Sequence, residues 1–380
     1  MNLSVVVKVA ESCNINCSYC YMYNGPDETW RRRPRLMGEK VFADMLPFLR
    51  SACASNPINS VQIIFHGGEP LLLPKIRFSR WCGEMVEAIG SLTRLELAVQ
   101  TNGMLVDQDW IDVFQRHSVR VGVSLDGPPE YNDELRVDHR GGGTYQRVCK
   151  GLQLLQEAAS AKRINSVGVL CVIDPRRDAR KIYRHFVDDL KIEHFDCLLP
   201  DFNHAHKPPF PISEYGRFLC DLFDEWSSRE DAEVDIRILS SIVSLLVGGP
   251  SFLASLGRST ATTLTIETDG AIGADDILRS SSPGEMWHGG SVSDVSFADL
   301  LSSEWMRSHR ASRSAPSECC KCVWVSACNG GSMLHRYDDE RRYDNRSVYC
   351  DALRMIYVKV ANYLIERGLS AGALARALAQ

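Results

Sequence analysis

Hydrophobic and polar residues alternate along five short stretches in the first half of the chain, which is the pattern of β-strands. These stretches are 5–9, 61–65, 95–99, 119–123 and 167–173. Between them, apolar residues recur with a helical period, which predicts helices at about 38–54, 107–115, 144–159 and 178–190. Strands that alternate with helices form a parallel sheet, either doubly wound or closed as a barrel. Functional loops are then expected at the carboxyl ends of the strands.

The second half of the chain has a different pattern. Helices are expected at 213–226, 236–247 and 348–367, with short strands and Gly-rich turns from about residue 262. The Pro-rich segment HAHKPPFP, residues 204–211, is the best candidate for a linker. In the first half, Thr144 is placed to cap the helix that it precedes. Pro47, inside the first helix, predicts a kink or a break.

Length, charge and hydropathy narrow the class of protein. A chain of 380 residues predicts two or three domains. The formal net charge of −5 argues against a surface for nucleic acid or anionic membranes. The N-terminus lacks the basic and apolar segments of a signal peptide, and the longest apolar stretch, near 242–247, is too short to span a bilayer. We therefore expect a cytoplasmic protein with no nucleic-acid or membrane partner.

The chain has 14 cysteines, and a cytoplasmic location excludes disulfides as the general explanation. Three lie within eight residues near the N-terminus, and five lie between Cys319 and Cys350. The others occur singly among apolar neighbours, and we interpret them as small buried hydrophobic residues. They are Cys53, Cys82, Cys149, Cys171, Cys197 and Cys220.

The N-terminal group has the spacing Cys13-x3-Cys17-x2-Cys20, directly after a predicted strand. Iron–sulfur cubanes that only transfer electrons normally take four cysteines. Three cysteine ligands leave one iron of the cubane without a protein ligand. Catalytic metal sites likewise keep a coordination position free for substrate. Zinc and chance are the alternative explanations. The spacing favours a catalytic [4Fe–4S] cluster.

The segment CNINCSYC resembles the CxxxCxxC signature of the radical S-adenosylmethionine (SAM) superfamily, and the resemblance includes the aromatic Tyr19. In that family the open iron chelates the amino and carboxylate groups of SAM. Reductive cleavage of SAM then yields a 5′-deoxyadenosyl radical, which abstracts a hydrogen atom from the substrate. The resemblance implies an α/β fold, a partial (β/α)6 TIM-like barrel, with SAM as a consumed co-substrate.

Later segments agree with this resemblance in kind and order. Gly67-Gly68-Glu69-Pro70 follows a strand, like the family's GGEP motif, whose backbone and glutamate contact the SAM amino group. A glycine pair lets the backbone approach a ligand closely. The segments 101–103 (TNG) and 124–127 (SLDG) end the next two strands, and Ser124 matches a polar SAM contact of the family. Arg136 lies where relatives place an arginine near the SAM carboxylate, the alternative being a solvated surface charge.

The C-terminal cysteines Cys319-x2-Cys322-x5-Cys328 and Cys350 resemble the SPASM extension of radical SAM enzymes that modify peptides. A full SPASM domain holds two auxiliary [4Fe–4S] clusters. The four ligands of one cluster match here, whereas Asp275 and Ser332 stand where the other cluster requires cysteines. We therefore expect one auxiliary cluster, with Cys320 pointing away from it. A structural zinc on the same four thiolates is the alternative.

The segments TDGAIGADDIL and CNGGSMLHRY…YDNRSVYCDAL resemble a SPASM subgroup that forms cyclophanes, in which an aromatic side chain is joined to a nearby β-carbon. The resemblance implies a maturase of ribosomally made precursor peptides. Thioether cross-linking and formylglycine formation in sulfatases are alternatives within the same enzyme class. A non-catalytic iron–sulfur electron-relay protein is the alternative from another class.

This chemistry needs a base and two partners. Asp275 and Asp126 are the first candidates for the base, with Asp276 and Glu69 as further ones. The partners are a precursor peptide with a leader and a flavodoxin- or ferredoxin-type reductant. Because the sequence starts directly with a predicted barrel strand, we expect the leader to bind the surface of the barrel or of the SPASM region.

Four regions follow from these motifs. Residues 1–205 are predicted to form the radical SAM partial barrel and residues 206–260 a helical bridging region. Residues 261–350 are predicted to form a SPASM-like domain with one auxiliary cluster, and residues 351–380 a C-terminal helix.

Two cubanes bound by cysteine predict about eight irons per chain after anaerobic reconstitution. Iron and zinc analysis of the purified protein measures this number. About twelve irons would mean that a third cluster has ligands elsewhere in the chain. About four irons together with stoichiometric zinc would reject the auxiliary cluster in favour of zinc.

Overall fold

The structure is a computed structural model that describes residues 1–380 except 230–232, 259–260, 283, 285 and 380. The chain divides into two units that each contain segments from distant parts of the sequence. The first unit comprises Met1–Leu125, Asn132–Gly168 and Thr260–His309. The second comprises Asp126–Tyr131, Val169–Ser259 and Arg310–Gln380. The functional boundaries expected at 205, 260 and 350 stay a prediction.

The strands of the first unit follow the order β12-β11-β10-β1-β3-β4-β5. The pairs from β10 to β5 are parallel, and β11 and β12 are added antiparallel at the end. A separate antiparallel ribbon joins β2 to β6. The bounds are β1 Asn2–Ala10, β2 Ile15–Cys17, β3 Ser60–Gly67, β4 Arg94–Thr101, β5 Arg120–Ser124, β6 Arg136–Asp138, β10 Thr262–Ile266, β11 Ala271–Gly273 and β12 Trp287–Ser291. The predicted α/β class with a central parallel sheet is confirmed.

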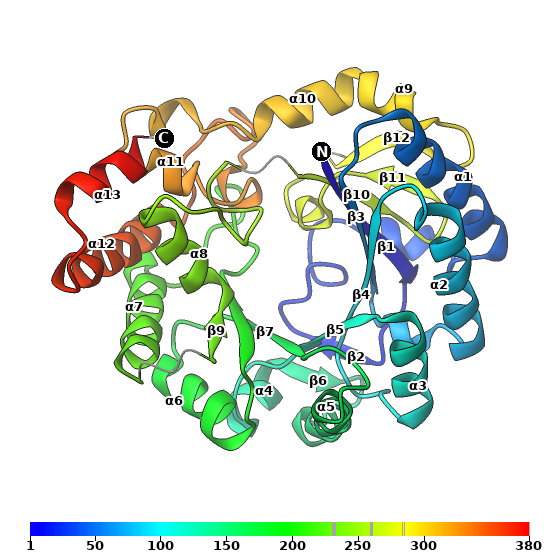
Figure 1. Ribbon diagram of the computed structural model, residues 1–380, viewed down its shortest axis with the longest axis horizontal. Helices are drawn as coiled ribbons and strands as arrows, with labels where there is room; N and C mark the ends of the chain where they lie inside the picture. Colours follow the sequence, from blue (N-terminus) through cyan, green and yellow to red (C-terminus); the bar gives the residue numbers. More distant parts are fainter. Residues whose placement is uncertain (230–232, 259–260, 283, 285, 380) are drawn as a thin grey trace. The chain divides into compact units, whose positions relative to one another are not determined.

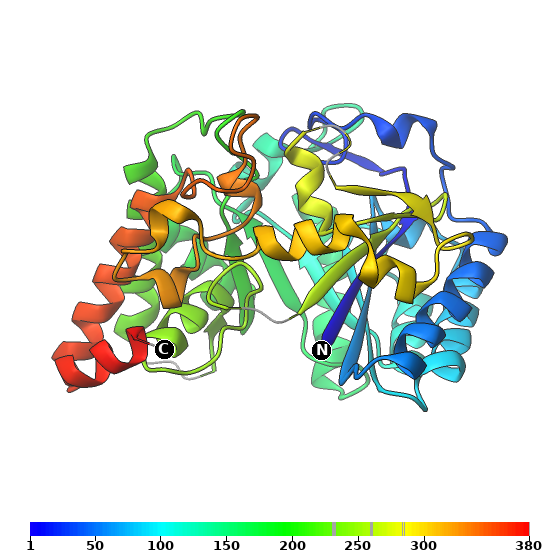
Figure 2. The same ribbon diagram turned by 90° about the horizontal axis from the view of Figure 1, so that it is seen from above.

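Helices cover the outer face of these strands, as Figures 1 and 2 both show for α1 and α2. The bounds are α1 Glu39–Ser55, α2 Lys75–Ile89, α3 Gln108–His117, α4 Pro129–Leu135, α5 Tyr145–Ser160, α9 Phe297–Ser302 and α10 Glu304–Ser312. Aromatic side chains fill the layer between sheet and helices. The ring of Phe78 lies 4.5 Å from Phe65 of the sheet and 5.2 Å from Trp110 of α3. These rings fix the helices on the sheet, so the opposite face of the strands is left for function.

The second unit contains strands β7, β8 and β9 and most of the remaining helices. The bounds are β7 Gly168–Val172, α6 Ala179–Arg184, the π-helical turn η3 His185–Asp189, β8 His194–Leu198, α7 Ile212–Arg229, β9 Asp235–Ile236, α8 Arg237–Leu246, α11 Val325–Cys328, α12 Cys350–Glu366 and α13 Ala371–Leu378. Helices α7 and α12 pack along each other, and Gly216 lets α7 approach Met355 closely.

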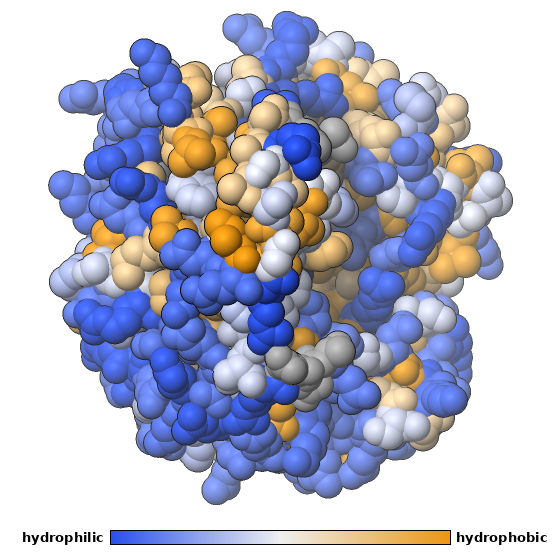
Figure 3. All heavy atoms as spheres, turned by 60° about the vertical axis from the view of Figure 1, so that its left-hand side comes forward, coloured by the Kyte–Doolittle hydropathy of each residue, from blue (hydrophilic) through white to orange (hydrophobic). Residues whose placement is uncertain are grey.

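Figure 3 shows a largely hydrophilic face with hydrophobic residues gathered mainly in its upper half.

Most of the expected elements are present, and the differences have physical reasons. Helix α2 was missing from the sequence-based expectation, although its inner positions Phe78, Trp81 and Met85 are buried. Pro47 does not break α1, because the helix buries an apolar face that continues past the proline. Thr144 precedes α5 but does not cap it; its hydroxyl donates to the Arg136 carbonyl oxygen instead.

Two further expectations concern segments. Residues 204–211, the expected linker, lie inside the second unit. Among the residues that the structure describes, no helix is both long enough and apolar enough to cross a membrane.

Replacing Ile63 by Ala tests the importance of the central strand. Ile63 is fully buried in β3, between two parallel neighbours, and the truncation is expected to lower the free energy of unfolding by about 2–5 kcal/mol. The matched control is Val86→Ala on the exposed side of α2, where the side chain is 47% exposed and the change should stay within about 0.5 kcal/mol. Equal urea midpoints for both variants would contradict the expectation that Ile63 stabilises the core more than Val86 does.

Candidate active site and metal centres

The inner face of the first unit's sheet carries polar side chains near the carboxyl ends of its strands. Lys8 of β1 lies directly opposite His66 of β3 in the register of the two strands. Val99 of β4 pairs with Phe65 of β3. Gln100 and His66 are the next residues of these two strands, so their side chains lie on the same face of the sheet. The amide nitrogen of Gln100 donates to the Ser124 hydroxyl at 3.0 Å. This face has a polar surface suited to binding a ligand.

The three N-terminal cysteines lie on the loop that follows β1. The short strand β2 pairs with β6 so that Cys17 lies opposite Arg136. The Arg136 guanidinium, which is buried, donates to the Tyr19 hydroxyl at 2.7 Å. The structure therefore brings together two of the predicted SAM-binding residues and one predicted metal ligand.

The three thiols form one group. The Cys13 thiol interacts electrostatically with both Cys17 and Cys20. Burial raises the pKa of Cys13 to about 12 and also raises the pKa of Cys20. Buried thiolates need positive charge nearby, and a metal centre deprotonates the thiols that coordinate it. The donor set fits a cubane with one iron left open.

The glycine pair after β3 allows the loop to approach the cysteine loop. Gly67 has φ of 134°, and a β-carbon there would lie 2.1 Å from the Ala10 carbonyl oxygen. A β-carbon on Gly68 would lie 1.8 Å from the Tyr23 hydroxyl. The Gly68 N–H donates to the Ala10 carbonyl at 2.8 Å. Larger residues are therefore excluded where GGEP meets the cysteine loop.

The carboxylate of Glu69 is fully buried and holds three donors of the chain. Its Oε1 accepts from the Leu71 N–H at 2.9 Å and from the Thr101 hydroxyl at 2.7 Å. Its Oε2 accepts from the Asn102 N–H at 2.8 Å. Burial raises the pKa of Glu69, and these hydrogen bonds oppose the shift. The side chain therefore ties the GGEP loop, which continues into η2 Pro70–Leu72, to the end of β4.

Asn102 continues this link to the cysteine loop. Its side-chain nitrogen donates to Asn14 Oδ1 at 2.7 Å and lies 3.8 Å from the Cys13 sulfur. The His139 ring nitrogen donates to the Cys13 carbonyl oxygen at 2.9 Å. The first cysteine is thus held from two sides.

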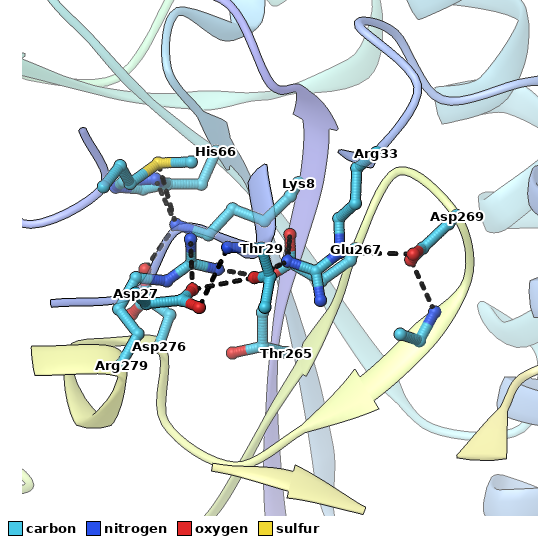
Figure 4. A network of polar contacts seen from close by, with 12 residues as sticks. Lys8, Asp27, Thr29, Arg33, His66, Thr265, Glu267, Asp269, Asp276 and Arg279 are labelled. Atoms are coloured by element: carbon cyan, nitrogen blue, oxygen red, sulfur yellow. Dashed lines mark hydrogen bonds and ion pairs between the residues drawn. The ribbon is translucent and has the colours of Figure 1, made fainter. Parts of the chain in front are cut away.

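A buried network surrounds Asp276, which begins η4 (Asp276–Ser280) (Figure 4). Its Oδ2 accepts from Lys8 Nζ and from the Tyr21 hydroxyl, both at 2.5 Å. Burial alone would raise the pKa of Asp276, but the Lys8 ammonium holds it well below its usual range. Burial and Lys8 together lower the pKa of His66 to about 3, so the ring is neutral. Asp276 is therefore an ionised carboxylate on the polar inner face.

A second buried group of charges lies beside the first (Figure 4). Arg279 forms an ion pair with Glu267 and a longer one, 3.5 Å, with Asp27. Arg33 lies 3.6 Å from Glu267. Burial raises the pKa of Glu11 to about 9, and the neighbouring Glu267 carboxyl adds to the shift. Glu11 before the cysteine loop, and Asp27 and Arg33 after it, therefore interact with Glu267 and Arg279, which lie on either side of Asp276 in the sequence.

The other candidates for the base have different environments. Asp126 belongs to the second unit, and its Oδ1 accepts from the Val172 N–H at 2.9 Å, which anchors β7. Asp275 precedes η4, and its carbonyl oxygen accepts from the Leu278 N–H at 3.0 Å. Of the four carboxylates considered from sequence, Asp276 is the one that a lysine holds ionised on the inner face.

The four C-terminal cysteines form a second group, within the second unit. Cys319 ends η5 (Ser317–Cys319), Cys328 ends α11 and Cys350 begins α12. The Cys328 thiol interacts electrostatically with Cys319, Cys322 and Cys350. Burial raises the pKa of Cys328 to about 12, and a hydrogen bond from the Gly330 backbone opposes the shift. The donor set fits a cluster closed by four thiolates.

Two observations bear on what this second group holds. Cys320 is exposed, and its sulfur lies 3.7 Å from the Pro316 carbonyl oxygen. Among the described residues no three His, Cys, Asp or Glu side chains converge on one point as ligands of a single ion do. A structural zinc on the same four thiolates stays the alternative to a cluster.

Several residues of these sites were not found by sequence reasoning. Lys8, Tyr21 and His66 were not singled out, although a lysine inside the apolar strand VVVKVA is a signal, because unpaired lysines are almost never fully buried. Arg336 was also missed. It is 1% exposed, and its charge acts on the Cys319 and Cys328 thiols, which makes it a counter-charge for a bound cluster.

Comparison with known proteins agrees with this geometry. Residues 7–182 match the Radical SAM superfamily. The chain is 26% identical to a cysteine-type anaerobic sulfatase-maturating enzyme of Clostridium perfringens, covering 93% of this chain and 95% of that enzyme. It is 25% identical to a serine-type anaerobic sulfatase-maturating enzyme of Bacteroides thetaiotaomicron, covering 88% of this chain and 83% of that enzyme.

Solved structures show the same fold. The structure of native anSMEcpe with bound AdoMet and the Cp18Cys peptide superimposes with a TM-score of 0.81 at 22% identity, covering 97% of this chain and 99% of that chain. The structure of native anSMEcpe with bound AdoMet alone also gives 0.81 at 22% identity, covering 96% of this chain and 99% of that chain.

Replacing Cys13, Cys17 and Cys20 by Ala tests the first metal centre. The variant is expected to lose all production of 5′-deoxyadenosine from SAM and dithionite, and to keep about four irons on the C-terminal group. The control is Cys149→Ala combined with Cys220→Ala, since these thiols lie outside both groups. It should keep both the activity and the iron content. Continued 5′-deoxyadenosine formation in the triple variant would reject the assignment.

Proposed function

We propose that this protein, whose residues 7–182 match the Radical SAM superfamily, is a maturase that removes a hydrogen atom from the β-carbon of a peptide residue. The observation that carries the proposal is the arrangement on the inner face of the first unit. A three-thiolate loop, the GGEP loop and the ionised carboxylate of Asp276 are joined there by one set of hydrogen bonds. The similarity to sulfatase-maturating enzymes over nearly the whole chain supports a peptide as substrate.

When the cluster and SAM are bound, they supply a carbon-centred radical that abstracts hydrogen. The residues of the chain bind, orient and transfer protons. Arg136 and Ser124 are the candidates that bind SAM, with Arg136 fixed by Tyr19. Glu69 holds the loops in place without contacting the reacting atoms. Asp276 accepts the proton that the substrate loses, and Lys8 keeps it ionised until then.

The first candidate product is formylglycine, favoured by the relatives. Loss of a hydrogen atom, a proton and an electron turns a serine side chain into an aldehyde. From cysteine the same loss gives a thioaldehyde, which water hydrolyses to the aldehyde with release of hydrogen sulfide. The hydrogen atom would leave in 5′-deoxyadenosine and the proton would go to Asp276. A cluster held by Cys319, Cys322, Cys328 and Cys350 would supply the acceptor for the electron.

The second candidate is the cyclophane cross-link. One observation favours it: Asp275 and Ser332 stand where a second auxiliary cluster requires cysteines, and the segments around them resemble the cyclophane subgroup. In this reaction the Cβ radical adds to a neighbouring aromatic ring. The ring then loses a proton and an electron to recover its aromaticity. The demands on the protein are the same in both reactions.

Asp276→Asn tests the proposed base. The variant keeps the shape of the side chain but cannot accept a proton, so peptide modification should fall at least about a hundredfold, the usual contribution of a general base. SAM cleavage to 5′-deoxyadenosine should continue, measured by chromatography in the same reaction. The control is Asp126→Asn in the second unit. If both variants lose modification equally, or neither does, Asp276 is not the base.

The reaction with a peptide separates the two products. A serine-containing sulfatase peptide and a cysteine-free peptide rich in aromatic residues are incubated with SAM and dithionite, then treated with a hydrazide and sequenced by tandem mass spectrometry. Both products lose two hydrogens. A hydrazide adduct identifies formylglycine, and suppressed fragmentation between an aromatic residue and a nearby β-carbon identifies the cross-link. Unmodified peptides alongside abundant 5′-deoxyadenosine would reject both candidates.

A further inference from the structure

A groove lies in the second unit, beside the C-terminal cysteines but outside the sites described above. It encloses a cavity of about 290 Å³. Its floor is apolar, with Phe210, Ile212 and Val348 among the residues that line it, and Cys350 lines it as well. One of the four cysteines that fit the auxiliary cluster therefore lines the groove.

The walls of this groove are fixed by hydrogen bonds. One wall is the Pro-rich segment 204–211. The His204 N–H donates to the Tyr337 carbonyl at 2.9 Å, and the His204 ring donates to the Arg346 carbonyl at 2.8 Å. At the base of the segment, the Tyr349 hydroxyl donates to the Pro200 carbonyl at 3.1 Å. A segment that resembles a linker in sequence is instead a wall that is hydrogen-bonded at its start to Tyr337 and Arg346.

The rim of the groove is positively charged. Lys207 and Arg346 are exposed there, and neither forms an ion pair with any residue that the structure describes. The acidic residue of the rim, Asp351, lies 3.8 Å from Arg354, which offsets its charge. The chain as a whole has a net charge of −5, so this cationic rim stands out against an acidic protein.

We propose that this groove, defined by residues 204–212 and 346–351, is the docking site of an acidic one-electron carrier protein. The inference rests on the proposed function, which requires one electron to leave after each oxidation of substrate. An apolar floor with a cationic rim matches the small interfaces of electron-transfer partners, which bury little area. Complementary charge then speeds their encounter rather than tightening the complex.

The position of Cys350 favours a carrier over other acidic partners. A peptide that only docks has no reason to contact a cluster ligand, whereas an electron carrier does. The transfer is balanced, because one electron passes from the group held by the four cysteines to the oxidised carrier, which becomes reduced by one electron. The reverse transfer, from reduced carrier to oxidised cluster, uses the same contact.

The test measures binding of an acidic plant-type ferredoxin and of an acidic flavodoxin to the iron-loaded, full-length protein. Lys207→Glu combined with Arg346→Glu should weaken binding by at least about tenfold at low salt. The matched control is Lys150→Glu with Arg116→Glu, which makes the same charge change at exposed positions of the first unit. Its affinity should change less than about twofold. Stopped-flow bleaching of the iron–sulfur absorption by reduced carrier should slow in parallel.

Three results would overturn the proposal: no binding of either carrier, equal loss in the groove variant and the control, or displacement of the carrier by a short acidic peptide. Iron content and circular dichroism check that the variant folds. If it does not, Lys207→Gln with Arg346→Gln tests the same rim with less repulsion. Production of 5′-deoxyadenosine with dithionite, which needs no docking, tests the proposed function separately from the groove.

Discussion

The buried carboxylate of Glu69 is the interaction on which the geometry of the first unit depends. Moving a carboxylate from water into the interior costs several kcal/mol unless hydrogen bonds replace its hydration. Three donors do so here, and they come from two separate loops, η2 and the end of β4. Because Asn102 supplies one of them and also contacts the cysteine loop, three segments distant in sequence are held together. Loss of this carboxylate would leave three donors unpaired at the point where the cysteine loop is fixed.

Paired charge also explains why the inner face can be polar. Lys8 and Asp276 are both buried, and each is tolerated because the other is present. The same pairing decides the chemistry: Lys8 keeps Asp276 ionised and His66 neutral. The Cys13 and Cys328 thiols show the opposite situation, because burial raises their pKa more than the neighbouring backbone hydrogen bonds lower it. The missing positive charge is what a metal cluster provides.

Sequence predicted the parts of the site that are local and missed the parts that depend on packing. The cysteine spacing and the glycine pair are fixed by neighbours in sequence, and the structure groups Cys13, Cys17 and Cys20 as expected. Asp276 could not be preferred over its neighbour Asp275, because only the fold brings Lys8 to it from 268 residues away. The fold class followed from strand–helix alternation. Helix α2 was missed although its buried residues Phe78, Trp81 and Met85 recur with a helical period. The role of residues 204–211 was missed because a proline-rich wall and a linker have the same composition.

The two candidate products make the same demands on the protein, and this limits what overall similarity can decide. Both begin with a Cβ radical, and both need one proton acceptor and one electron acceptor. Asp276 of the first unit is the proposed proton acceptor in either reaction. What differs is the group that lies beside the radical: an oxygen or sulfur on the same carbon leads to an aldehyde, and an aromatic ring leads to a carbon–carbon bond. Similarity to sulfatase-maturating enzymes over 93% of the chain therefore supports the abstraction step. The product is determined by which peptide side chain is held beside the radical, and hence by the residues that select the peptide.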